Sequence, residues 1–277
     1  MPAKIVIAKL GMLGISPLLE GLVDERGVRE DVLIRSVSSG CQMNLEAGRE
    51  IANSTVALKP DIVFLVSPHI PGEGPQVALS TFSQNELPVC VLTNSYSQKV
   101  MDALIEQKIG YIISTADPMI GARKEFLDPT EMAIFNSDII KVQAITGVYK
   151  IINEEIDRII NDINNKKAIQ MPQLVIDKEL AVNRSKFVNP YAYAKSIAAF
   201  EASTLVAKLS TRGCYVVKDT NQYIPLVAAS HELMRIAAML SDESRELEKK
   251  GDTVSREVHL SNGVQRRKAR LFELFTP

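Results

Sequence analysis

Short runs of β-branched and other apolar residues alternate with longer amphipathic stretches through the first half of the chain. Five runs have the length and composition of buried strands: KIVIA at 4–8, DVLIRSV at 31–37, DIVFLV at 61–66, PVCVLT at 88–93 and GYIIS at 110–114. The intervening segments leave room for a helix each, and residues 44–58 and 95–107 place apolar side chains at helical spacing. This alternation predicts right-handed βαβ units and a Rossmann-like, mostly parallel sheet in an α/β domain over residues 1–128.

The pattern becomes helical after Asp128, which is placed to cap a helix that begins at Pro129. A stripe of Ile and Val follows, with Gly147 as its one interruption, and it predicts a long packed helix that bends there. Further elements are expected at 173–177, a short strand, and at 190–209 and 225–249, two helices. Together they predict a helical-bundle domain over residues 129–253.

The C-terminal segment, residues 254–277, alternates apolar and polar residues on both sides of Asn262-Gly263. An Asn-Gly pair between two alternating runs is a strong hairpin signal, because both residues accept the positive φ that tight turns need. A small antiparallel β hairpin is therefore expected after the helical domain.

The composition excludes several function classes. The 277 residues are 46% hydrophobic, enough to bury one large core or two smaller ones, and the formal net charge is −1. So small a net charge provides no global field to attract nucleic acid or an anionic membrane surface. No segment approaches the ~20 apolar residues of a membrane span, and the first residues resemble no signal peptide. We expect a cytoplasmic protein with no nucleic-acid or membrane partner.

Cysteine and histidine patterns disfavour a disulfide framework or a metal site. The chain contains Cys41, Cys90, Cys214, His69, His231 and His259. The cysteines are odd in number, far apart and set among apolar or small neighbours, so buried thiols are expected. The histidines share no metal spacing, and His231-Glu232 does not continue into HExxH. No metal is expected.

Three loops follow strands at the edge of the sheet where open α/β proteins bind ligands: 9–16, 67–75 and 115–128. KLGMLG at 9–14 opens a helix, so its backbone N–H groups could hold a phosphate, although a plain tight turn would look the same. Lys9 could lend a positive charge to a phosphate or an anionic ring.

The first loop does not match a dinucleotide-binding fingerprint. It lacks the three-glycine spacing, and Ser36, Ser38 and Ser39 stand where an acidic residue would take a ribose hydroxyl. NAD is therefore disfavoured.

SPHIPGEGP at 67–75 predicts a stiff loop that either brings backbone close to a flat ligand or forms a rigid turn. His69 in this loop is more typical of a surface histidine than of a catalytic base. The sequence contains no GxSxG, no P-loop and no cysteine with an obvious base. Such a chain is either a binding protein or an enzyme whose cofactor supplies the chemistry, for which hydride transfer is suitable.

The polar loop TADPMIGARKEFLDP at 115–129 has two interpretations. Charged loops usually only connect elements on the surface. This one follows the fifth predicted strand, however, which puts it at the ligand-binding edge of the sheet.

The block from 115 to 148, TADPMIGARKEFLDPTEMAIFNSDIIKVQAITGV, resembles the coenzyme F420-dependent methylenetetrahydromethanopterin dehydrogenases of methanogenic and related archaea. The resemblance extends over nearly the whole chain, through KLGMLG with LVDERGVREDV, QLVID, FVNPYAYAKSIAAFEAS and YIPLVAASHELMRIAAMLSDESRELEK. It implies reversible hydride transfer between C5 of the deazaflavin F420 and a cationic methenyl-tetrahydromethanopterin. This chemistry requires no general acid or base, and carboxylates near the cation assist it.

Candidate site residues follow from the resemblance, position by position. Those for the pterin substrate are Asp117, Met119, Gly121, Arg123, Lys124, Glu125, Asp128, His231 and Glu232. Those for F420 are Lys9, Gly11, Met12, Gly14, Pro68, Pro71, Gly74, Pro75 and Asn94. Asp117, Glu125 and Asp128 would contact the pterin or stabilise its positive charge. Arg123 and Lys124 would bind anionic groups of either ligand. His231 and Glu232 would close the cleft or form an ordinary helix-surface pair.

The sequence departs from the family pattern at Met12, where many members have asparagine, and at TNSYSQK, 93–99. Both departures keep open a non-catalytic α/β ligand-binding or regulatory protein. An NADP-dependent pterin dehydrogenase is a further alternative. A Rossmann triple-glycine loop would indicate it, and this sequence lacks that loop. The resemblance also implies a homohexamer, a trimer of dimers.

Overall fold

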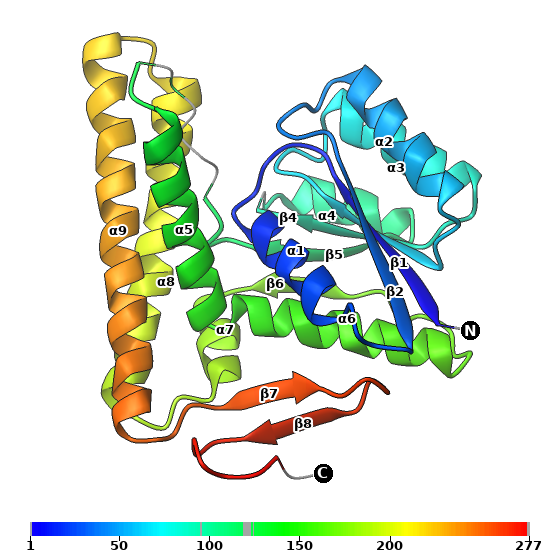
Figure 1. Ribbon diagram of the computed structural model, residues 1–277. Helices are drawn as coiled ribbons and strands as arrows, with labels where there is room; N and C mark the ends of the chain where they lie inside the picture. The colour runs from blue at the N-terminus through cyan, green and yellow to red at the C-terminus, as the bar shows by residue number, and fades with distance from the viewer. Residues whose placement is uncertain (1, 95, 119–122, 124, 276–277) are drawn as a thin grey trace. The chain divides into compact units, whose positions relative to one another are not determined.

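The computed structural model describes residues 2–94, 96–118, 123 and 125–275 (Figure 1). The chain forms two compact units. The sheet unit consists of Met1–Ser114, Ile152–Val175 and His259–Gln265, and the helical unit of Thr115–Ile151, Ile176–Val258 and Arg266–Pro277. The domain limits expected from the sequence, after residues 128 and 253, stay a prediction.

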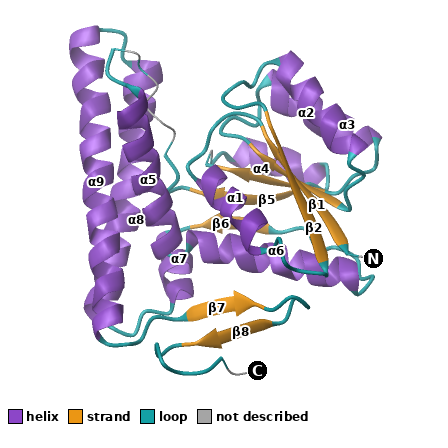
Figure 2. Ribbon diagram, in the orientation of Figure 1, coloured by secondary structure: helices purple, strands orange, loops and turns teal. Residues whose placement is uncertain are grey.

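A six-stranded sheet in the order β2-β1-β3-β4-β5-β6 organises the sheet unit (Figure 2). Its strands are β1 (Ala3–Lys9), β2 (Val32–Ser38), β3 (Ile62–Val66), β4 (Val89–Thr93), β5 (Gly110–Ser114) and β6 (Gln173–Ile176). The pairs β1–β2, β1–β3, β3–β4 and β4–β5 are parallel. The five predicted strands are confirmed to within one residue at either end, and the strand candidate at 173–177 becomes the edge strand β6.

Helices cover both faces of this sheet. They are α1 (Ile15–Glu25), α2 (Leu45–Ala57), α3 (Glu73–Gln84), α4 (Gln98–Glu106) and α6 (Val148–Asn164). Val63 and Leu65 pack into one core with α2, α3 and α4, and Phe64 between them points to the opposite face. Cys90 has Glu155 of α6 as an electrostatic neighbour. β3, β4 and β5 are buried over their full length, and they are apolar except for Thr93 and Ser114 at the ends of β4 and β5.

An ion-pair cluster joins distant parts of the sheet unit. The buried guanidinium groups of Arg26 and Arg29 each donate to Oδ1 of Asp157 at 2.8 Å. His259 lies 2.9 Å from the same carboxylate through Nε2 and 2.8 Å from Glu25 through Nδ1. Burial acts to raise the pKa of Asp157, but the hydrogen bond from His259 and the two guanidinium groups lower it to about 2. Asp157 is therefore ionised, and it ties α6 and His259 to the end of α1.

The helical unit packs three long helices side by side (Figure 1). Its elements are α5 (Pro129–Ile145), α7 (Lys178–Ser185), α8 (Pro190–Thr211), the π-helical turn η1 (Arg212–Val216) and α9 (Thr220–Lys250). Phe135, Val142, Val206 and Met234 from α5, α8 and α9 form its core. The predicted start of α5 at Pro129, with Asp128 as its cap, is confirmed.

The predicted start of α9 at Pro225 was wrong, because the helix begins at Thr220 with the Asp219 side chain as its cap. Proline is unfavourable inside a helix because its nitrogen cannot donate to the carbonyl four residues earlier. That carbonyl belongs here to Asn221, an exposed residue of the first turn, where water can replace the missing donor.

The hairpin at the C-terminus is confirmed as β7 (Arg256–His259) paired with β8 (Gln265–Lys268). Gly263 has the expected positive φ, +81°. Within the described residues, no helix is long and apolar enough to cross a bilayer. Cys90 is buried and Cys214 half-buried, but the expectation of a buried thiol was wrong for Cys41, which is exposed in the loop after β2.

Gly147 breaks the long helical pattern into α5 and α6 rather than bending one helix. Its φ is +100°, a conformation that side chains rarely adopt, and a Cβ atom there would lie 2.0 Å from the carbonyl oxygen of Ala181. The turn between α5 and α6 therefore requires glycine.

We predict that Gly147→Ala destabilises the protein by at least about 2 kcal/mol, because it combines backbone strain with a clash against backbone. Gly21→Ala is the matched control, since a Cβ at this position of α1 meets nothing within 4 Å. The control should be neutral or stabilising by up to about 1 kcal/mol through helix propensity. Thermal unfolding of both variants tests this, and similar melting temperatures would contradict it.

Candidate functional site

The strand order of the sheet unit reverses between β1 and β3, since β2 lies on one side of β1 and β3 to β5 follow on the other. Such a switch point opens a crevice at the carboxyl ends of the two strands, where doubly wound proteins bind their ligands. The loops after β1 and β3 hold most of the predicted cofactor residues. The structure thus brings Gly11 and Pro68, from separate sequence motifs, close together at this switch point.

Gly11 lets these loops approach closely. Its φ is +88°, and a Cβ atom would lie 2.5 Å from Sδ of Met43 and 3.0 Å from Cδ of Pro68. Gly74 is similarly constrained, because its Cβ would lie 2.3 Å from the carbonyl oxygen of Met43. Met43, in the loop after β2, thus lies against both glycines, and no sequence pattern predicted this role.

The two helices that start from these loops have unusual amino termini. Gly14 precedes α1 and Gly72 precedes α3, and neither helix has a side-chain cap among the described residues. Helix amino termini without a capping side chain are suited to a phosphate group. The loop geometry therefore supports the phosphate interpretation of KLGMLG over the plain turn.

The other predicted cofactor residues lie in varied environments. Lys9 is mostly buried, and its ammonium group lies 3.4 Å from the Glu20 carboxylate, which also accepts a hydrogen bond from Ser36 at 2.7 Å. Met12 and Asn94 are half-buried, Pro68 and Pro75 are buried, and Pro71 is exposed. The positive charge of Lys9 is thus partly compensated by the Glu20 carboxylate.

In the helical unit, the chain after β5 is fixed to two helices. The carbonyl oxygen of Ala116 accepts hydrogen bonds from Gln143 of α5 and from the hydroxyl of Ser203 on α8, the latter at 2.7 Å. Asp117, the next residue, is only 1% exposed. A buried carboxylate next to a backbone carbonyl that is fixed in this way suits the stabilisation of a positive charge.

The side chain of Arg123 contacts other parts of the protein. Its guanidinium group lies 3.4 Å from the carbonyl oxygens of Gly213 and Val217 and stacks 4.3 Å from the ring centre of Tyr223. These contacts satisfy several of its donors and add a cation–π attraction. Arg123 therefore attaches the polar loop to η1 and α9.

Asp128 and Glu125 lie on the surface. Asp128 accepts hydrogen bonds from the N–H groups of Thr130 at 2.7 Å and Glu131 at 2.8 Å, as the cap of α5. Glu125 is exposed. Met119, Gly121 and Lys124, also predicted to bind substrate, lie outside the described residues.

His231 is a core histidine rather than a surface residue. Its ring stacks on Phe135 at 3.9 Å and meets the edge of Phe126 at 4.9 Å, while Nδ1 lies 2.7 Å from the Glu131 carboxylate. Burial lowers the pKa of His231, and the interaction with Glu131 offsets only part of that shift. The neutral ring thus donates through Nδ1, and Glu232 beside it is exposed.

The geometry defines an α/β protein that combines a flavodoxin-like strand order with phosphate-compatible loops and a helical unit holding a buried carboxylate. The sequence profile of methylene-5,6,7,8-tetrahydromethanopterin dehydrogenase matches residues 3–276. The chain belongs to this family.

Similar proteins cover almost its full length. The F420-dependent methylenetetrahydromethanopterin dehydrogenase of Archaeoglobus fulgidus is 46% identical over 95% of both chains. The protein of the same name from Methanocaldococcus jannaschii is 42% identical over 99% of both. A solved F420-dependent methylene-tetrahydromethanopterin dehydrogenase, in complex with methylene-tetrahydromethanopterin and coenzyme F420, superposes with a TM-score of 0.94 at 38% identity and full coverage of both chains.

We predict that His231 makes stability depend on pH. The folded state disfavours the protonated ring, so the contribution of His231 is complete above a pH of about 6.5 and is lost as the pH falls below that value. At about pH 8 the wild type should therefore have a higher melting temperature than His231→Gln, and this difference should shrink as the pH falls to about 5. The exposed His69→Gln serves as the baseline, and an advantage that grows on acidification would contradict the assignment.

Proposed function

We propose that this chain catalyses reversible hydride transfer between methylene-tetrahydromethanopterin and coenzyme F420 in one-carbon metabolism. The observation that carries the proposal is the full-length structural match to a dehydrogenase solved with both of these molecules. The 46% identity to a curated F420-dependent relative supports the same activity.

The residues of the sheet unit fit a deazaflavin with a phosphodiester tail. The switch-point crevice at β1 and β3, the backbone opened by Gly11 and the uncapped amino terminus of α1 are compatible with a flat ring and a phosphate. The end of β2 presents Ser36 and Ser38 instead of a ribose-binding acid, which is consistent with a cofactor other than NAD(P). Bound F420 supplies the ring carbon that takes up or returns the hydride.

The chain's own residues would position the reactants and stabilise charge. We assign Asp117 to stabilising the positive charge of the oxidised pterin, because its carboxylate is buried beside a backbone fixed on two helices. Arg123 would act on the loop through its contacts with Gly213 and Tyr223 rather than on the substrate. Activity in the cytoplasm is part of the same proposal.

The decisive experiment mixes purified protein with methylene-tetrahydromethanopterin and oxidised F420, and follows the loss of oxidised deazaflavin absorbance. We expect F420-dependent turnover and none with NADP. Turnover with NADP alone would refute the cofactor assignment, and binding of both molecules without turnover would favour a non-catalytic protein.

Asp117 and Asp128 form an informative pair of acids. Asp117→Asn should lower kcat by about tenfold or more with little change in F420 affinity, because a neutral amide no longer stabilises the cationic pterin. Asp128→Asn should leave both quantities and stability nearly unchanged, since Asn caps helices about as well as Asp. Steady-state kinetics of both variants separate the roles, and an equal fall in kcat would show that Asp128 also acts on the substrate.

The oligomer we propose is a homohexamer arranged as a trimer of dimers. Exposed apolar side chains on the long helices are consistent with subunit contacts: Tyr191 is 74% exposed, Ile236 52% and Met239 56%. Light scattering should give the mass of six 30.5 kDa chains. A single-chain mass at micromolar concentration would refute the hexamer.

A further inference from the structure

Two fully buried polar side chains of the helical unit meet at a single backbone carbonyl. Gln143 of α5 and Ser203 of α8 are 0% exposed, and both donate a hydrogen bond to the carbonyl oxygen of Ala116, which is also fully buried. One donor is enough to satisfy a buried carbonyl. A second donor from a different helix fixes the carbonyl along two lines, so it leaves far less freedom for the carbonyl to change direction.

Ser203 differs from the other serines on its face of α8. Ser196, Ser203 and Ser210 follow each other at intervals of seven residues, so they lie on one face of the helix, and all three are buried. Ser210 donates to the carbonyl of Ala207 within the same helix, and the hydroxyl of Ser196 has no hydrogen-bond partner in the part of the chain that the structure describes. Of the three, Ser203 is the one that reaches the chain after β5.

The carbonyl that Gln143 and Ser203 hold belongs to the peptide group between Ala116 and Asp117. A peptide group is planar, so the direction of this carbonyl also sets the position of the Asp117 nitrogen and Cα. Pro118 follows Asp117 and disfavours helical backbone conformations for it. The backbone of Asp117 is therefore constrained from both sides, and the position of its buried carboxylate depends mainly on the rotation of its own side chain.

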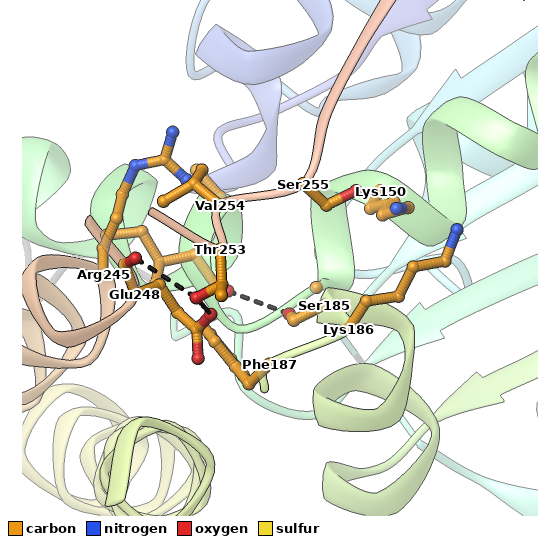
Figure 3. Close-up of a pocket in the computed structure, with 12 residues that line it drawn as sticks. Lys150, Ser185, Lys186, Phe187, Arg245, Glu248, Thr253, Val254 and Ser255 are labelled. Atoms are coloured by element: carbon orange, nitrogen blue, oxygen red, sulfur yellow. Dashed lines mark hydrogen bonds between the residues drawn. The ribbon is translucent and has the colours of Figure 1, made fainter. Parts of the chain in front are cut away.

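Another buried polar group of the helical unit has a structural role. The Glu248 carboxylate, beside the pocket in Figure 3, accepts hydrogen bonds from the N–H groups of Val188 at 2.9 Å and Asn189 at 2.7 Å, and from the hydroxyl of Thr253. These residues join the end of α9 to the segment before α8. They were not predicted as ligand contacts, so Glu248 and Thr253 provide a structural comparison for Gln143.

We propose that Gln143 and Ser203 are positioning residues of the pterin site: they hold the Ala116–Asp117 peptide so that the Asp117 carboxylate lies where it stabilises the cationic pterin. The two side chains act through Asp117 rather than on the substrate. Electrostatic stabilisation falls with distance and depends on preorganised groups, so a carboxylate that has lost its backbone support stabilises the cation less. This role rests on the proposed function, which assigns Asp117 to the pterin.

The test compares the equilibrium affinities of the intact protein for methenyl-tetrahydromethanopterin, a cation, and for methylene-tetrahydromethanopterin, by isothermal titration without F420. The two molecules differ by one hydride, so the ratio of their affinities isolates the effect of the positive charge. Ser203→Ala and Gln143→Met should each lower the preference for the cation by about three- to tenfold, the value of one hydrogen bond. Both should also lower kcat while leaving the KM for F420 unchanged.

Ser196→Ala and Thr253→Val are the matched controls. Ser196→Ala removes the same hydroxyl from the same face of α8, where it has no partner among the described residues, and should change the ratio less than about twofold. Thr253→Val removes a hydrogen bond to a buried carboxylate, so it should lower the melting temperature but not the ratio. A loss of stability is thereby separated from a loss of positioning.

A double variant tests whether the effect passes through Asp117. In the Asp117→Asn background, Ser203→Ala should lower the ratio by less than about twofold more, because the charge that it helps to place is already gone. The proposal is overturned if Ser203→Ala and Gln143→Met leave the ratio unchanged, or if Thr253→Val lowers it equally. It is also overturned if Asp117→Asn does not lower the ratio, or if Ser203→Ala has its full effect without the carboxylate. A wild type that prefers the cation but shows no F420-dependent turnover would instead refute only the proposed function.

Discussion

A parallel sheet must be covered on both faces, and this requirement shapes the whole chain. The apolar residues of β3 to β5 leave no face for water, so helices must supply two layers. The N-terminal βα repeats provide α1 to α4, but the face that carries Cys90 also requires α6, which follows α5 in sequence. The chain therefore passes into the helical unit and returns before the sheet unit is complete.

The sequence predicted the strands well because β3, β4 and β5 are short runs of mostly apolar residues, and even β2, which contains Arg35 and Ser36, begins with the apolar residues Val32 to Ile34. The interruption at Gly147 and the turn at Gly263 were also predicted, because both residues have a positive φ, which glycine adopts more easily than other residues. The start of α9 was misplaced because a proline such as Pro225 is compatible with two positions in a helix. It can stand in the first turn, or further inside where the carbonyl that lacks its donor belongs to an exposed residue, and the local sequence pattern does not distinguish these positions.

The roles of the polar residues were harder to predict, because they depend on partners far away in sequence. Arg123 contacts carbonyls 90 and 94 positions later, and His231 meets Glu131 at a separation of 100. No local signal distinguishes an arginine that binds substrate from one that fastens a loop. Resemblance to the dehydrogenase family located the loop, and the contacts distinguish a buried carboxylate, Asp117, from residues that hold it in place.

The cluster around Asp157 has a consequence for how the protein is made. The fully buried Arg26 needs the carboxylate of Asp157, 131 positions later, and Glu25 contacts His259, 234 positions later. At 5–20 residues per second, a ribosome needs on the order of ten seconds to synthesise the chain between Arg26 and Asp157. Until then the emerging β-strands have an uncompensated guanidinium beside them, and the sheet unit can mature only when translation is nearly finished.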